Sequence, residues 1–253
     1  MRRSPTALVT RLRALLDRLV ESREMPKNEM QAVADEVAAA ARALPREGLL
    51  EALDKAIGRS QRRRREAVYL LTEWQDLPAA AEKLGQWLYE PDETWRRWLV
   101  QVVGENGMDR YCPQLAEIIA NDPDAECRAF ALHSAARLRC PQALPMLLRL
   151  AEESDGKQRS GLVWALKEYA TEDCRPHLER SFSDSQPKGD RVVAAWGLGK
   201  FGDQRAIAYL IAMLDEQDES LRAAQALCDI HGWPFEWHAD FVAKTKERTA
   251  GNA

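Results

Sequence analysis

The sequence lacks any long apolar run, and no hydrophobic stretch approaches the roughly 18 residues that a membrane-spanning helix needs. Its N-terminal segment is interrupted by Arg11, Arg13 and Asp17, so it has no continuous apolar core like that of a signal peptide. We therefore expect no membrane contact and no secretion signal. The formal net charge of -4 gives no global electrostatic reason to expect nucleic acid, although a local basic patch leaves that partner open.

Cysteine is sparse and follows no recognisable motif. The chain has 5 cysteines, an odd number, and none of them forms a CxxC pair. The sequence therefore predicts neither a disulfide framework nor a zinc knuckle. A reduced cytoplasm is the simplest compartment for such a chain. The cysteines are Cys112, Cys127, Cys140, Cys174 and Cys228.

Motifs of the common enzyme classes are also missing. The sequence shows no Ser-His-Asp grouping and no Walker loop, and Gly197, Gly199 and Gly202 are assigned to a helix and its end instead of a phosphate-binding loop. No carboxylate or second histidine lies at metal-ligand spacing beside His133. We expect no metal and no cofactor, and an enzyme of a common class is not supported.

A repeat of about 32 residues runs through the chain. An arginine recurs at steps of 31 or 32 residues, and helix-like sequence follows it, with apolar positions three, four and seven residues on. A second apolar helical stretch, such as QRAIAYLIAMLD, separates successive arginine helices, so each period is a predicted helical hairpin. Turn clusters such as EPDET, NDPDAE, ESDGK and DEQDES supply N-cap oxygens. The recurring arginines are Arg64, Arg96, Arg128, Arg159, Arg191 and Arg222.

The segment GLGKFGDQRAIAYLIAMLDEQDESLRAAQAL resembles the short HEAT-repeat family, including the variety named after phycobilin lyases, in its turn Asp and its Arg near the start of the second helix. The resemblance covers about residues 60–235 and implies an all-α fold, a right-handed α-solenoid of HEAT-like hairpins. It also implies that the repeat arginines bridge to turn carboxylates of adjoining repeats. The family contains scaffolds, adaptors, lyases and some nucleic-acid enzymes, so it does not fix a function. Its iron-dependent hydroxylases use His-Glu pairs, and no HE dipeptide occurs here.

We predict one continuous solenoid with a cap at each end. Residues 1–58 depart from the period and form an N-terminal helical cap, because a terminal repeat needs a polar outer face. Residues 59–232 hold five to six HEAT-like repeats. Residues 233–253 form a C-terminal capping helix that starts near Pro234, followed by a tail. The residues expected to seal the last hairpin are Trp233, Trp237 and Phe241.

A column of side chains is expected to face the concave groove of the solenoid. At about 100° per residue, the first and fifth positions after each repeat arginine point away from the apolar stripe. Aromatic or imidazole side chains occupy the fifth position in four of six repeats, and such a surface usually marks an interaction site. The candidate binding residues are Arg65, Tyr69, Arg97, Gln101, His133, Arg137, Trp164, Lys167, Trp196 and Lys200, and the same pattern places Val192, Ala223 and Leu227 in the groove.

Two interpretations of the column remain open. In the first, the chain is a non-enzymatic adaptor that binds a protein segment, with Trp164 and Trp196 as apolar anchors and with Arg65 and Arg97 paired to carboxylates. In the second, the two tryptophans lean sideways and pack between adjacent helices.

Nucleic-acid binding is the alternative function. The stretch VWALKEYA resembles a segment of the HEAT-like alkylpurine DNA glycosylases, which implies contacts of Trp164 and Lys167 with the lesion region and the backbone. The basic run Arg62 to Arg65 would add phosphate contacts. However, TWRRWLVQVV, at the place of that family's groove Asp, has no carboxylate. A lyase or chaperone role of the phycobilin-lyase type rests only on the name of the repeat variety.

Overall fold

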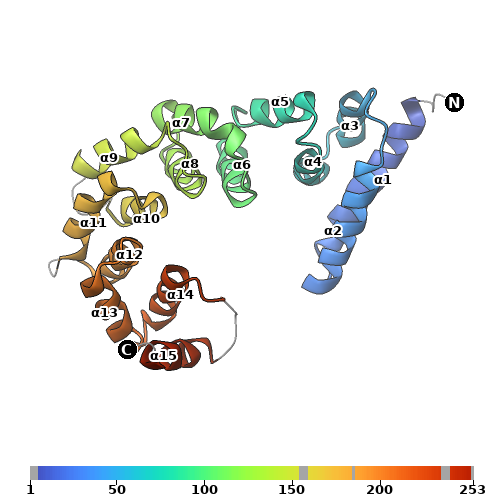
Figure 1. The fold of residues 1–253 in the computed structure, drawn as a ribbon. Coiled ribbons are helices and arrows are strands. Elements are labelled where there is room, and N and C mark those ends of the chain that lie inside the picture. The colour runs from blue at the N-terminus through green and yellow to red at the C-terminus, as the bar shows by residue number, and fades with distance from the viewer. Residues whose placement is uncertain (1–4, 154–158, 184–185, 235–239, 252–253) are drawn as a thin grey trace. The chain divides into compact units, whose positions relative to one another are not determined.

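The computed structural model describes residues 5–153, 159–183, 186–234 and 240–251, and all regular elements in these ranges are helical (Figure 1). The predicted all-α class is therefore confirmed. The chain divides into two compact units, Met1–Glu90 and Pro91–Ala253. No described helix is both long enough and apolar enough to cross a membrane.

The first unit holds the three helices expected as an N-terminal cap and two more. Helix α1 packs against α2, α3 and α4, and Leu12, Leu16 and Leu53 are fully buried, as their helical spacing predicts. Ser60 caps α4 by accepting a hydrogen bond from the Arg63 amide. The helices are α1 (Pro5–Ser22), α2 (Lys27–Arg42), α3 (Leu49–Ile57), α4 (Gln61–Glu73) and α5 (Pro78–Trp87).

The second unit is a row of stacked hairpins, the arrangement of an α-solenoid. Each arginine-bearing helix packs against the next one, in the order α6, α8, α10, α12 and α14. Figure 1 shows these five on the inner side of the row and α7, α9, α11 and α13 on the outer side. The helices are α6 (Glu93–Glu105), α7 (Cys112–Asn121), α8 (Ala125–Arg137), α9 (Leu144–Glu153), α10 (Arg159–Tyr169), α11 (Arg175–Phe182), α12 (Lys188–Gly199), α13 (Gln204–Met213), α14 (Ser220–His231) and α15 (Phe241–Gly251), with short 3-10 turns at Asp109–Tyr111 and Glu172–Cys174.

Two of the repeat arginines, Arg64 and Arg96, bind turn carboxylates as the family resemblance implies, whereas Arg128 donates to backbone carbonyl oxygens and Arg222 pairs with Glu219, three residues before it. The Arg96 guanidinium forms a buried ion pair with Asp122, which lies in the turn before α8, at an Nε–Oδ2 distance of 2.8 Å. Arg64 pairs in the same way with Glu90, in the turn after α5. Two of the predicted N-caps are present, because Asp92 and Asp124 accept hydrogen bonds from amides in the first turns of α6 and α8. The DEQDES cluster supplies no side-chain cap to α14, and most of ESDGK lies outside the described residues.

Small residues let α12 approach its neighbours closely. A Cβ at Gly197 would lie 2.8 Å from Leu178 Cδ1 of α11, and one at Gly199 would collide with Ile230 of α14. Gly202 has φ 77°, the left-handed conformation that glycine adopts most readily. The assignment of these glycines to a helix and its end is therefore correct.

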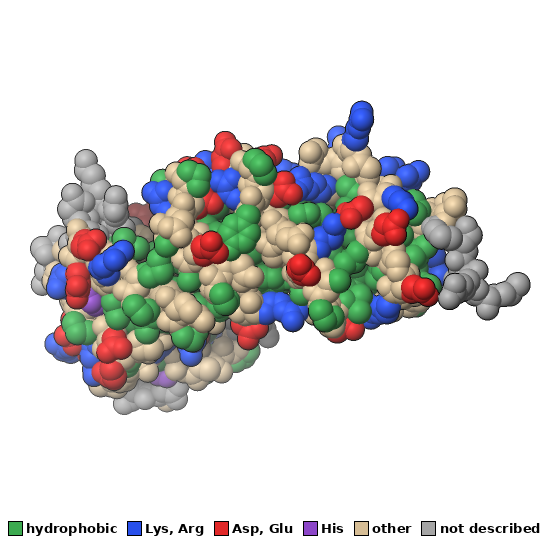
Figure 2. Space-filling view, turned by 90° about the horizontal axis from the view of Figure 1, so that it is seen from above, with side chains coloured by type: hydrophobic (Ala, Val, Ile, Leu, Met, Phe, Trp, Pro, Cys, Tyr) green, Lys and Arg blue, Asp and Glu red, His purple; other side chains and the backbone are tan. Residues whose placement is uncertain are grey.

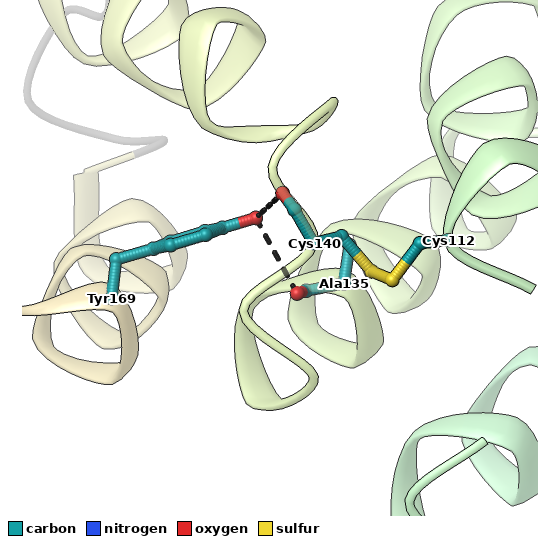
Figure 3. The surroundings of a disulfide bond; sticks show 4 residues. All are labelled: Cys112, Ala135, Cys140 and Tyr169. Carbon is teal, nitrogen blue, oxygen red and sulfur yellow. Dashed lines mark hydrogen bonds between the residues drawn. A yellow bond between two sulfur atoms is a disulfide. The ribbon is translucent and has the colours of Figure 1, made fainter. Parts of the chain in front are cut away.

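A disulfide joins Cys112, at the start of α7, to Cys140, in the turn after α8, with a Cα–Cα distance of 5.3 Å (Figure 3). The prediction that no disulfide is encoded was wrong. The two cysteines are 28 residues apart and no local motif links them, but the antiparallel hairpin brings the start of α7 beside the end of α8. The disulfide removes one ground for the expected cytoplasmic location, because disulfides are rare in reduced compartments, and that location stays a prediction.

The C-terminal helix packs where the sequence expected a cap, but it begins later. Residues 233 and 234 are not helical, and α15, which starts at Phe241, packs on α14 with Phe241 and Thr245 buried. Pro234 itself is not helical, and residues 235–239, which would follow it in the expected helix, lie outside the described residues. Trp233 stacks instead on His231, with ring centroids 4.5 Å apart. Trp237 lies outside the described residues.

Candidate functional site

The inner helices of the second unit enclose an open hollow of about 1050 Å³, which we call the inner hollow. It is formed by the end of α8, by α10 and α12, and by α14 with the turn that follows. Four of the candidate residues from the sequence meet there. Its lining residues are Arg137, Lys167, Glu168, Trp196, Lys200, Gln225, Cys228, Asp229, Gly232 and Trp233.

A buried lysine between two indole rings forms one wall of the inner hollow. Lys167 is only 2% exposed, and its Nζ lies 3.9 Å from the ring centroid of Trp196 and 4.7 Å from that of Trp164. The two indoles meet edge to face, with centroids 5.9 Å apart, and both keep part of their surface exposed. This is the sideways packing that the sequence left open, and cation–π attraction to Lys167 stabilises it.

Glu168 supplies the counterion for this lysine, through an ion pair between its Oε1 and Lys167 Nζ. Burial lowers the pKa of Lys167, while the hydrogen bond and the charge of Glu168 act in the opposite direction. Lys167 thus lines the inner hollow, but its flexible stem turns the ammonium group toward the indole rings and Glu168. The contact with a nucleic-acid backbone that the glycosylase resemblance implies stays a prediction.

Asp229 of α14 holds the other side of Trp196. Its Oδ2 accepts a hydrogen bond from Trp196 Nε1 at 2.7 Å and lies 2.8 Å from Lys200 Nζ. Burial alone would raise the pKa of Asp229, but the hydrogen bonds from Lys200 and Trp196 outweigh it and hold the pKa below its ordinary value. The indole is therefore fixed at its ring face by Lys167 and at its N–H by Asp229.

Arg137 is the remaining cation of the inner hollow. It is the last residue of α8 and is exposed. Within the part of the chain that the structure describes, no carboxylate pairs with its guanidinium, whereas Lys167 and Lys200 each have a carboxylate partner. The inner hollow thus carries one cation more than it has carboxylates.

Of three other candidates on the inner helices, Arg97 and Gln101 are hydrogen-bonded within the fold and His133 is partly buried. Arg97 makes two hydrogen bonds to Asp124, at 2.6 and 2.7 Å, and a further ion pair with Glu126. Gln101 donates to the Arg97 carbonyl oxygen. His133 is partly buried, and its desolvation lowers its pKa while Glu168 acts to raise it. The structure therefore gives Arg97 internal carboxylates in place of a partner's.

Tyr69 and Arg65 belong to the first unit and do not line the inner hollow. The Tyr69 hydroxyl donates to the Ala34 carbonyl oxygen of α2 at 3.2 Å, and Arg65 is exposed on α4.

The expected groove positions fail in the last repeats. Val192, Ala223 and Leu227 are completely buried. For Ala223 and Leu227 of α14 the reason is a change of register, because Asp229 follows Trp196 by 33 residues while Arg222 follows Arg191 by 31. The groove positions of α14 are consequently Gln225 and Asp229, which sequence reasoning missed. The step of 32 residues between Trp164 and Trp196, continued once more, leads to the buried Cys228, so the repeat spacing gives no signal for this shift.

No group of three or more histidine, cysteine, aspartate or glutamate side chains is placed to hold a metal ion among the described residues. The cysteine of the inner hollow, Cys228, is buried and contacts the Thr245 hydroxyl.

Two family models match the chain. The model of HEAT repeats matches residues 112–193, and the model of the PBS lyase HEAT-like repeat matches residues 190–216. No curated protein matches the chain. The matched residues run from the start of α7 to just beyond α13 and contain Lys167, Trp196 and Lys200 of the inner hollow, whereas Trp233 lies beyond them. Residues 112–216 are HEAT-like repeats, as the sequence resemblance predicted.

Proposed function

We propose that the chain is a non-enzymatic binding protein that takes a segment of a partner protein into the inner hollow of its second unit. The observation that carries this proposal is the inner hollow itself, which has a volume of about 1050 Å³ and is lined by Trp196, a side chain held in one orientation. Partly exposed tryptophan in a concave site is the side chain that most often dominates the energy of a protein interface.

The fixation of Trp196 supports the proposal further. Asp229 binds its N–H, Lys167 covers one face, and Trp164 packs against it. A side chain that is already ordered loses little conformational freedom on association, so more of the contact energy remains for affinity. Trp196, Arg137 and Lys200 are the residues of this proposed site, and Lys167 and Trp164 hold Trp196 in place. Arg97 has no part in it, because Asp124 and Glu126 bind its guanidinium.

Nucleic acid is the weaker alternative. Lys167, which would contact the backbone, is buried and paired with Glu168. In the basic run, Arg63 is paired with Asp17 and Arg64 with Glu90. Figure 2 shows acidic and basic side chains interspersed on the face in view, without a continuous basic stripe. A role like that of a lyase has only the name of the matched repeat in its favour.

The test is capture of partners from native cells with the tagged full-length chain. We expect a protein that wild type captures to be lost with Trp196→Ala, because the anchor is removed. Ile211→Ala is the matched control, since Ile211 is an exposed apolar residue, 40% accessible, on the outer helix α13. Circular dichroism of each variant establishes that it is folded. The same set of captured proteins with all three chains would contradict the proposal.

A further inference from the structure

We propose that the occupant of the inner hollow is an extended acidic peptide segment, in which an Asp or Glu lies beside an apolar side chain. Arg137 binds the carboxylate and Trp196 receives the apolar side chain. This inference rests on the proposed function and adds the chemistry of the partner to it.

The ion pairs of the inner hollow determine which charge an occupant should carry. Glu168 is already paired with Lys167, and Asp229 accepts hydrogen bonds from both Lys200 and Trp196. A basic segment would therefore compete with internal donors for both carboxylates. Removing the donor from the partly buried Glu168 leaves its desolvation uncompensated, and the more exposed Asp229 would lose two charge-assisted hydrogen bonds.

An acidic segment meets no such competition at Arg137. Its guanidinium is exposed at the edge of the inner hollow and pairs with no carboxylate of the described residues. Guanidinium presents a planar fork of N–H donors that matches the two oxygens of a carboxylate, and such bidentate, charge-assisted pairs are among the stronger hydrogen bonds of proteins.

Apolar contacts come from two tryptophans in the lining of the inner hollow. Trp196 is partly exposed, and Trp233 stacks on His231 so that its ring also reaches the inner hollow. An apolar side chain placed against either indole would gain roughly 25 cal/mol for each Å² removed from water. Arg137 and Trp196 line the same hollow, so a carboxylate and an apolar side chain close together in one segment fit it.

A phosphate backbone fits this surface less well. Affinity for nucleic acid comes from several cations that each neutralise a phosphate. Here Lys167 and Lys200 are engaged by carboxylates, which leaves Arg137 as the cation without one among the described lining residues.

The test uses a displayed library of random 12-residue peptides, selected on the full-length chain. We expect enriched peptides to carry Asp or Glu next to a Leu, Phe, Trp or similar residue, and to be lost on Trp196→Ala. Selection on Arg137→Glu should change the enriched charge from acidic to basic. Arg149→Glu is the control, because Arg149 is 69% exposed on the outer helix α9 and makes only a 3.9 Å contact with Glu153.

Binding of a fluorescently labelled selected peptide then measures how much the contact between Arg137 and the peptide carboxylate contributes to affinity. Arg137→Ala should weaken binding about tenfold, as expected for loss of a charge-assisted contact. Replacing the acidic residue of the peptide by its amide should have a similar effect. The two changes together should weaken binding less than the product of the single effects, because they remove one interaction.

Three results would overturn the inference. They are enrichment of basic or uncharged peptides, failure to enrich any peptide that depends on Trp196, and Arg137-dependent binding of a labelled single-stranded 20-base DNA in preference to the peptides. A partner protein that is lost with Trp196→Ala but retained with Arg137→Glu would leave the proposed function standing and reject only the acidic segment.

Discussion

At position 124 a single carboxylate caps a helix and binds an arginine of the preceding repeat. Asp124 accepts from the Cys127 amide at the start of α8 and from the Arg97 guanidinium of α6. The sequence predicted the cap, because Asp at a turn before a helix satisfies free amides. The sequence also predicted that Arg97 faces the groove, because a helical wheel describes one helix and does not show that Asp124, in the next turn, binds this guanidinium.

The charge of Asp124 should make stability depend on pH at the acid end. The hydrogen bond from Arg97 lowers the pKa of Asp124 to about 2 in the folded chain, below its ordinary value of 3.8. A depressed carboxyl pKa stabilises the fold above the unfolded value, and this stabilisation is lost as pH falls from about 4 to about 2. Asp124→Asn retains a capping oxygen but has no charge. We expect it to unfold at a lower temperature than wild type at pH 6.

Thermal unfolding of both chains between pH 6 and pH 2 measures this effect. The difference in midpoint between wild type and Asp124→Asn should shrink as pH falls through the window from 4 to 2. A difference that stays constant with pH would show that the charge of Asp124 contributes nothing and that only the cap was altered.

Lys167 shows why the chemistry of one residue is hard to infer from sequence. Its hydrocarbon stem and ammonium group fill the space between Trp164 and Trp196. We expect Lys167→Ala to lower the free energy of unfolding by about 2 to 3 kcal/mol, because packing and cation–π attraction are lost together. Urea unfolding followed by tryptophan fluorescence measures it.

Lys188→Ala is the matched control for Lys167→Ala. Lys188 also pairs with a glutamate, Glu216, but both side chains are about half exposed. Its replacement should change the free energy of unfolding by less than about 0.5 kcal/mol, as is usual for surface ion pairs. Equal losses in the two variants would mean that the rings contribute nothing at Lys167.

At the scale of the helices, the repeat period correctly predicted where the helices lie, but the register of the repeat did not predict which side chains are exposed in every helix. Every arginine of the repeat lies in or at the start of a helix, because helical periodicity depends only on neighbours along the chain. Which face is exposed depends on how one helix packs on the next. In α14 that packing turns Leu227 inward and Asp229 outward, and a fixed step of 31 residues cannot show it.

Among the contacts between helices, we expect the disulfide to contribute most to the free energy of unfolding. It ties the first residue of α7 to the turn after α8, where the Cys140 carbonyl oxygen accepts a 2.7 Å hydrogen bond from the Tyr169 hydroxyl of α10 (Figure 3). Closing a loop with a separation of 28 residues corresponds to about 3.5 kcal/mol of lost unfolded-state entropy. We expect Cys112→Ser with Cys140→Ser to lower the free energy of unfolding by about 2 to 4 kcal/mol.

Urea unfolding of the double variant and of wild type, each with and without dithiothreitol, measures this effect. Reductant should destabilise wild type and leave the double variant unchanged. Cys174→Ser is a control, since Cys174 is buried without a disulfide. If wild type without reductant were no more stable than the double variant, the disulfide would not stabilise the fold.

At the scale of the whole molecule, the inner hollow lies entirely in the second unit. The sequence predicted a single groove along a continuous solenoid, with Arg65 and Tyr69 at one end. The geometry of the inner hollow needs neither residue. What composition did indicate correctly is the absence of a strong charge of one sign, since 36 basic residues face 40 acidic ones.

That balance leads to a prediction for nucleic acid. Wild type should bind a labelled 20-base DNA, single-stranded or duplex, more weakly than about 100 µM at 50 mM salt, because few cations are left to neutralise phosphates. The double variant Asp17→Asn, Glu90→Gln releases Arg63 and Arg64 from their ion pairs. It should bind more tightly than wild type, with an affinity that falls steeply as salt rises. Fluorescence anisotropy between 20 and 200 mM salt tests both chains. Micromolar binding by wild type with a steep salt dependence would instead make nucleic acid the partner and reject a protein segment.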